Sequence, residues 1–256
     1  MFVMHNPVRW VDPTGLFAQL PQRFLPGGGL CPNGQRMMAA MRAGASSTTS
    51  PPSFGSSTTI TDVQNAMEAG ADLLVFVGGM TAFGSSTRLP QHASVQIFIA
   101  PGHALWDTGH FRSIWGGIGH ATIGGFTANR DFSGIRGAVG EIGEPMVGLI
   151  NDGFDRRLSA LNSLTHLPRV TAAQVERMFS GAQTFTDRGA IPYNPIGIGG
   201  HNSNSFIAGL LHDAEIRRPT MSNSIFGGFP GWSNPIPVRY FRPIPPIEVA
   251  PGEFLV

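Results

Sequence analysis

Glycine and proline interrupt this chain so often that many short elements are favoured over a helical bundle. The 256 residues include 34 glycines and 21 prolines, together about a fifth of the chain, against a usual share of roughly 12%. Glycine weakens the interior of a helix or strand, and proline removes a backbone donor. The sequence therefore predicts many turns and long connections, in a chain long enough for one or two domains with a sizeable core.

Hydrophobic periodicity indicates both helices and strands. Thr59 is a favourable cap residue before Val63, Ala66 and Met67, which recur at helical spacing, and further helices are expected at Thr171–Ser180, around Arg156–Leu161 and at Phe206–Leu211. Strands are expected at Ala93–Ala100, Gly119–Phe126 and Ile135–Ile142. The apolar stretch Leu73–Val77 fits either a continued helix or a buried strand. The expected fold class is α+β, an antiparallel sheet packed against helices.

Composition narrows the possible partners and cofactors. The net charge is +1 and charged residues make up 13% of the chain, which gives no reason to expect a nucleic-acid partner. The single Cys31 excludes an intramolecular disulfide and a multi-cysteine metal site. No phosphate-binding loop or dinucleotide fingerprint occurs, so no cofactor is expected. The spacing of His103, Asp107 and His110 is not one that predicts a metal site, and no signal peptide or transmembrane run is found.

The N-terminal stretch NPVRWVDPTGL, residues 6–16, ends in turn chemistry, with proline following aspartate. It resembles the end of the core of Rhs/YD-repeat proteins, in which a β-cage surrounds a variable C-terminal toxin and the chain is cut after this motif by aspartates. The resemblance implies a self-cleavage motif of Asp12, Pro13, Gly15 and Leu16, with the cut after Leu16. We therefore expect residues 1–16 to end an Rhs core, residues 17–57 to form a Pro/Gly/Ser-rich linker, and residues 58–256 to form an effector domain.

The stretch Pro192–Asp213, PYNPIGIGGHNSNSFIAGLLHD, concentrates polar side chains before an apolar helix. Asn202, Ser203 or Asn204 can cap that helix, which is a purely structural role. A helix N-terminus also favours negative charge, so the same place suits a nucleophile or an anion site. Capping and catalysis are compatible here, and the sequence alone leaves both open.

The same stretch resembles the site of circularly permuted papain-like, NlpC-related hydrolases. In those families a strand-borne histidine, in the setting G-x-x-H followed by a small residue, precedes a cysteine nucleophile at a helix start. The resemblance implies that His120 is the base and that Ser203 stands where the relatives carry cysteine; serine is the weaker nucleophile and needs a well-placed base. Asn202 or backbone N–H groups are the expected oxyanion donors, and Glu141 or Asp131 the expected orienting residue. His103 is the reserve base.

These observations lead to one main hypothesis and its rivals. The main hypothesis is a secreted Rhs-type toxin, released by autoproteolysis and delivered into a target cell, for instance by type VI secretion. It would act as a Ser/His hydrolase or acyl-transfer enzyme on an ester, amide or thioester, with the parent β-cage and a cognate immunity protein as partners. One rival is a non-enzymatic toxin that disrupts membranes through Ala71–Met80. Another is a different toxin enzyme, a nuclease or an ADP-ribosyltransferase.

Overall fold

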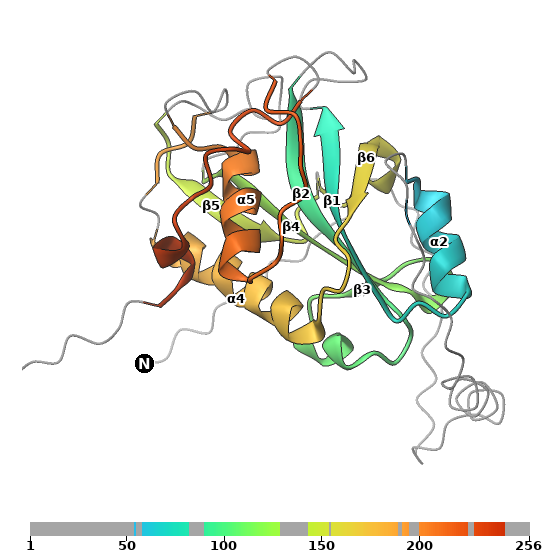
Figure 1. Ribbon diagram of the computed structural model, residues 1–256. Coiled ribbons are helices and arrows are strands. Elements are labelled where there is room, and N and C mark those ends of the chain that lie inside the picture. The colour runs from blue at the N-terminus through green and yellow to red at the C-terminus, as the bar shows by residue number, and fades with distance from the viewer. Residues whose placement is uncertain are drawn as a thin grey trace, which may run out of the picture. The chain divides into compact units, whose positions relative to one another are not determined.

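An antiparallel six-stranded sheet organises the fold (Figure 1). The computed structural model describes residues 54, 58–81, 90–128, 143–153, 155–188, 191–194, 200–224 and 228–243. The predicted core end (1–16) and linker (17–57) lie outside these residues, except for Phe54. The Phe54 ring packs edge-on against the Phe76 ring with 5.2 Å between centroids. At least this residue of the predicted linker therefore contacts the sheet.

The strand order is β3-β4-β2-β1-β6. β5 pairs with β4 on the same edge as β3 does. Every pairing between strands is antiparallel. The central strand β1 is buried from Leu74 to Met80, which explains its uninterrupted apolar character. The strands are β1 (Leu73–Thr81), β2 (Gln91–Ile99), β3 (Arg112–Ser113), β4 (Gly119–Thr127), β5 (Met146–Ile150) and β6 (Leu161–His166).

Three predicted helices are confirmed, and with the sheet they confirm the α+β class. They are α2 (Ile60–Glu68), α4 (Ala172–Arg188) and α5 (Ser203–Asp213). Thr59 caps α2 through a reciprocal capping box with Asp62. Short 3-10 turns complete the described elements: η1 (Ala104–Thr108), η2 (Trp115–Gly117), η3 (Leu158–Ala160) and η4 (Val238–Phe241).

Two local expectations are decided or corrected by the sheet. Leu73–Val77 is strand rather than helix, because β2 and β6 pair with it on both sides. The helix expected around Arg156–Leu161 is wrong: only the η3 turn forms there, and Leu161 begins β6 because pairing with β1 outweighs a weak helical pattern. The strand expected at Ile135–Ile142 lies outside the described residues.

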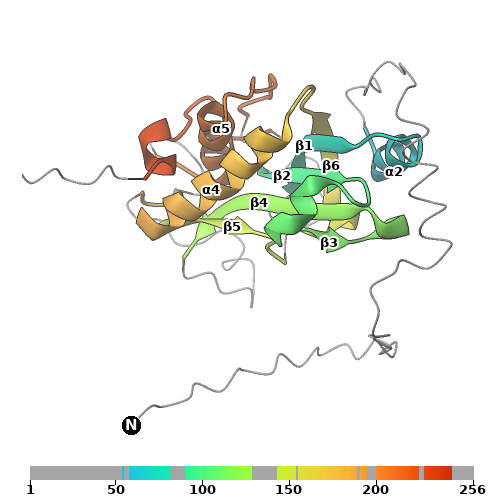
Figure 2. The same ribbon diagram turned by 90° about the horizontal axis from the view of Figure 1, so that it is seen from below.

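The two faces of the sheet are covered differently. On one face Val95 and Ile97 of β2 share a core with Phe206 and Leu210 of α5 and with residues of α4. On the other face Phe98 shares a smaller core with residues of α2. Figures 1 and 2 both show α4 and α5 lying together, with α2 apart from them. The alternation of side chains along β2 therefore assigns each residue to one of two distinct environments.

Glycines in β4 and β5 let α5 approach the sheet closely, as expected from the small residues of Gly119–Phe126. A Cβ atom added to Gly125 would lie 2.6 Å from Cβ of Phe206, and one added to Gly148 would lie 2.7 Å from Cζ of the same ring. Phe206 is fully buried at this contact. The start of α5 is thereby seated directly on the strand backbones.

Gly125→Ala tests this close approach. We expect it to lower the free energy of unfolding by about 1–3 kcal/mol, because the new methyl group overpacks against Phe206. Urea denaturation measures the change. Gly153→Ala is the matched control, since a Cβ there would meet nothing within 4 Å and a change within about 0.5 kcal/mol is expected. Equal stability of both variants and the parent would contradict the packing argument.

Candidate functional site at the start of helix α5

Asn202 is the residue that caps α5. Its Oδ1 accepts hydrogen bonds from the backbone N–H groups of Asn204 and Ser205, at 3.0 and 3.1 Å. Its Nδ2 donates to the carbonyl of Pro230 at 2.8 Å. The amide expected to serve as an oxyanion donor thus has a capping role in this structure, which corrects the assignment of Asn202 as a catalytic group.

Asn204 joins α5 to the sheet where β2 and β4 part. The last β2–β4 pair is Ser94 with Gly124. Beyond it, the N–H of Ala93 donates to Oδ1 of Asn204 at 2.7 Å, and Nδ2 of Asn204 donates to the carbonyl of Gln91 at 3.0 Å. The side-chain amide of Asn204 therefore takes the place of a neighbouring strand at this end of β2.

Ser203 lies between these two asparagines and is only 3% exposed. A hydrogen bond joins its hydroxyl to that of Tyr193, which is also buried. Burial raises the pKa of Tyr193 to about 12, and the bond to Ser203 lowers it in part. The phenol is therefore neutral at physiological pH and provides a fixed polar partner for the serine hydroxyl.

Two further polar groups flank Tyr193. The N–H of Tyr193 donates to the carbonyl of Glu144 at 2.7 Å, and Tyr193 forms a parallel bridge with His201 on its other side. Oε2 of Glu144 and Nδ1 of His201 are buried atoms without a hydrogen-bond partner. Buried polar atoms of this kind are uncommon and mark places where a water molecule or a ligand can bind.

His120 is not brought to Ser203. It is the Cα partner of Phe98 in the sheet, and the two rings stack with centroids 4.8 Å apart. Phe98 belongs to the core on the α2 face, whereas Phe206 of α5 packs on Gly125 on the opposite face. The sheet thus separates Ser203 from His120, and the expected pairing is wrong because one residue of strand parity decides the face.

A buried polar network holds His120 on its own face. Its Nε2 lies 2.9 Å from Oε1 of Gln96, which can only accept, so Nε2 carries the proton. Nε2 of Gln96 in turn donates to Oγ of Ser94 and to the carbonyl of Asp155. Burial, and then the charge of Arg156, lower the pKa of His120 to about 4. His120 is therefore a neutral structural histidine at physiological pH.

His92, like His201, lies near the start of α5 along the backbone. It is the second residue of β2, between the two residues whose peptide groups bind Asn204. Its Nε2 lies 2.9 Å from Oδ1 of Asp155, and the two side chains are 8% and 0% exposed. The carboxylate accepts the Nε2 proton of His92. A Cβ on Gly124 would lie 1.9 Å from Oδ2 of Asp155, so only glycine leaves room for this pair.

The remaining expected site residues lie elsewhere. His103 caps η1, where its Nδ1 accepts from the N–H of Leu105 at 3.1 Å, and its Nε2 faces Asp72 at 3.6 Å. His103 is thus not the reserve base for Ser203. The expected orienting residues Glu141 and Asp131 are outside the described residues. The self-cleavage motif lies there too: Asp12, Pro13, Gly15 and Leu16.

Sequence reasoning missed His92 and Asp155 for different reasons. His92 precedes Ala93 as His120 precedes Ala121, and only the preceding glycine of the expected motif is absent. This partial match to the histidine motif could have identified His92 from the sequence. Asp155 comes from the connection after β5 and reaches His92 across 63 positions of sequence. No pattern within a few residues of the sequence predicts a contact between residues so far apart.

Comparison with family models, with curated proteins and with solved structures gives no match. Within the described ranges, none of the helices combines the length and the hydropathy that a membrane span requires. Within the same residues, no group of three histidine, cysteine, aspartate or glutamate side chains is arranged to hold a metal ion.

Asn204→Ala tests the junction between α5 and β2. It removes bonds to Ala93, Gln91 and the carbonyl of Pro230, so we expect a loss of about 2–4 kcal/mol in the free energy of unfolding. Chemical denaturation measures this loss. Ser205→Ala, the matched control on the next residue, removes one bond to the carbonyl of Gly231 and should cost about 1 kcal/mol. A smaller effect at Asn204 than at Ser205 would refute the role assigned to this junction.

The buried His120 makes stability depend on pH. Its pKa falls from 6.5 to about 4 on folding, so between these values the unfolded chain binds the proton more tightly. The free energy of unfolding should therefore decrease as pH falls from about 6.5 to about 4, by up to about 3 kcal/mol from this group. Urea denaturation of the parent and of His120→Gln across this range isolates the contribution, because other titrating groups are common to both. Parallel pH profiles would contradict it.

Proposed function

We propose that this domain is a hydrolase or acyl-transfer enzyme in which Ser203 is the nucleophile, His92 the base and Asp155 the residue that orients the base. One observation supports this most directly. Asn204, the neighbour of Ser203, hydrogen-bonds the peptide groups on both sides of His92. The start of α5 therefore holds the backbone on both sides of His92, whose side chain pairs with Asp155.

His92 shares its side of β2 with His120, but its position differs. His120 lies within the β2–β4 pairing, so backbone separates it from α5. His92 lies beyond the last β2–β4 pair, where the side chain of Asn204 replaces β4. β1 still pairs with His92 through Met80, so the sheet is open only on the β4 side of this residue. This location makes His92 the better base for Ser203.

The proposed reaction gives each of these groups one role. Asp155 keeps the proton of His92 on Nε2, so Nδ1 removes the proton from Oγ of Ser203 as Oγ attacks an acyl carbon. The same nitrogen then protonates the leaving group. Water or another acceptor attacks the acyl-serine, releases the acyl group and restores the serine. The positive end of the α5 dipole favours the negative charge that develops beside Ser203.

The permuted papain-like architecture and the toxin assignment belong to the same proposal. The order of His92 on a strand, then Ser203 at a helix start, agrees with the order in the NlpC-related hydrolases that the sequence resembles. The motif at residues 6–16 supports a C-terminal effector released from an Rhs cage, with an immunity protein as partner and a target cell as destination. The membrane-disrupting alternative would require β1, buried between β2 and β6, to leave the sheet.

Labelling with a fluorophosphonate tests the proposal, since this probe reacts with activated serines. We expect one adduct, on Ser203, by mass spectrometry of the intact protein and its peptides, and none in Ser203→Ala. His92→Gln and Asp155→Asn should slow labelling by about 100-fold or more. Ser205→Ala and His120→Gln, the matched serine and histidine controls, should react at rates near that of the parent.

Several outcomes would overturn this assignment. They are no adduct at all, an adduct that persists in Ser203→Ala, or a greater loss in His120→Gln or His201→Gln than in His92→Gln. Thermal melting of each variant shows whether it is folded. Expression in target cells tests the toxin assignment separately: full toxicity of Ser203→Ala and His92→Gln, with dye leakage from liposomes, would favour the membrane alternative.

A further inference from the structure

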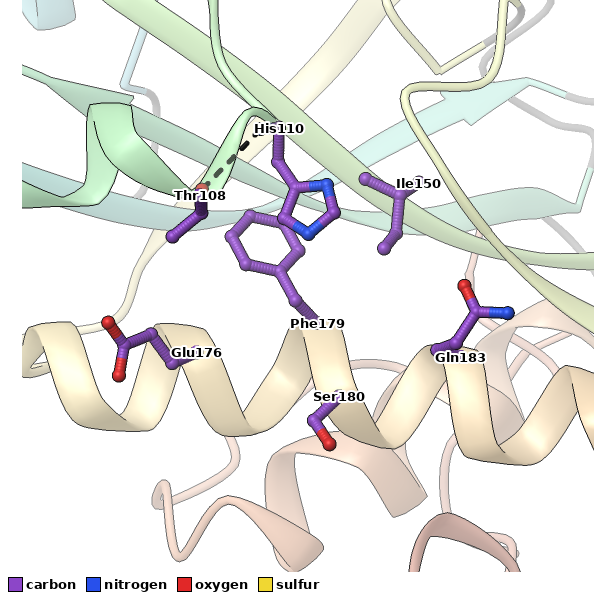
Figure 3. Close-up of a pocket in the computed structure, with 7 residues that line it drawn as sticks. All are labelled: Thr108, His110, Ile150, Glu176, Phe179, Ser180 and Gln183. Atoms are coloured by element: carbon purple, nitrogen blue, oxygen red, sulfur yellow. Dashed lines mark hydrogen bonds between the residues drawn. The ribbon is translucent and has the colours of Figure 1, made fainter.

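The surface between α4, the end of β5 and the segment that follows η1 is hollowed. A pocket of about 360 Å³ opens there, and Figure 3 shows the residues that line it. This volume is at the lower end of the range for small-molecule sites, which is roughly 300–1,000 Å³. The pocket therefore suits a small ligand.

The inner wall of the pocket is apolar and largely aromatic. The rings of His110 and Phe179 lie 4.4 Å apart between centroids, and Ile150 at the end of β5 completes the wall. In Figure 3 Phe179 rises from α4 towards His110, whose backbone N–H donates to Oγ1 of Thr108. Burial lowers the pKa of His110, so the imidazole is neutral at physiological pH and presents a ring rather than a charge.

Glu176 carries the one formal charge among the described residues that line the pocket. It is exposed on α4 and is followed by Ser180 and Gln183 at intervals of four and three residues, so all three share one helix face. Its neighbour Arg177 points elsewhere and binds Glu215 at 2.9 Å and Asp213 at 3.4 Å. The carboxylate of Glu176 is thus not neutralised by that guanidinium.

We propose that this pocket binds a small organic cation, with a flat apolar group on Phe179 and His110 and an ammonium or guanidinium group at Glu176. Aromatic faces attract cations, and a carboxylate beside an apolar wall adds direct charge complementarity. An anion of the same shape would be repelled by Glu176. Ser180 and Gln183 supply hydrogen-bonding groups at the rim. This site is independent of the reaction proposed for Ser203.

Tryptamine is a suitable probe because it joins an indole ring to a primary ammonium. With about a dozen non-hydrogen atoms, a fragment of this size binds with Kd of about 2 mM at ordinary ligand efficiency. Titration followed by two-dimensional NMR of the whole chain should show saturable shifts at Phe179, Ile150 and Gln183. Indole-3-ethanol, the neutral analogue, should bind about fivefold more weakly, and indole-3-acetate more weakly still.

Variants at exposed positions keep the proposal falsifiable without disturbing the core. Glu176→Gln should weaken tryptamine binding by about threefold to fivefold and remove the preference over the neutral analogue. Ser180→Trp should abolish binding by filling the pocket. Glu68→Gln, on α2 at the other face of the sheet, is the matched control and should bind like the parent. Equal binding of the three indoles, unchanged binding in Ser180→Trp, or no saturable shifts at about 10 mM tryptamine would each overturn the proposal.

Discussion

The side-chain amide of Asn204 makes the hydrogen bonds with β2 that a neighbouring strand would otherwise make. The contact between α5 and the sheet depends on these bonds. β2 and β4 separate after the Ser94–Gly124 pair, and an open strand end would otherwise leave unpaired backbone groups. Asn204 satisfies both groups, on Ala93 and Gln91, and also binds the carbonyl of Pro230. A single side chain thus joins the sheet, α5 and the segment after residue 228. Buried amide networks of this kind hold one arrangement because an unsatisfied alternative is costly.

The close seating of α5 makes that junction possible. Phe206 rests on Gly125 and Gly148, and a Cβ atom at either position would lie within 3 Å of its side chain. Asp155 is likewise admitted beside His92 because residue 124 is glycine. These glycines, which weaken the strand pattern in the sequence, therefore allow other side chains to pack directly on the strand backbone. They bring the helix to one face of β4 and a carboxylate to the other.

Much of the fold could be predicted from the sequence, but the pairing at the site could not. Thr59, the helix after Thr171 and the strand at Gly119–Phe126 are local patterns, and the structure confirms each of them. His120 was expected beside Ser203 because both sit in suitable local settings. Its ring instead stacks on Phe98 across the sheet from α5. A motif records the neighbours of a residue along the chain and does not record which side of a sheet it faces.

The sequence by itself determined the α+β class, most helix and strand positions, and Ser203 at a helix start, because these follow from periodicity and capping within a few residues. Only the tertiary structure decided that His92 pairs with Asp155 and that His120 stacks on Phe98. His92 and Asp155 meet across 63 positions, through a connection whose path depends on sheet pairing. The pocket beside Phe179 also depends on the tertiary structure, because α4, β5 and His110 come together only when the sheet is formed. Local propensity acts over one or two turns of chain, whereas a site is built from contacts between distant segments.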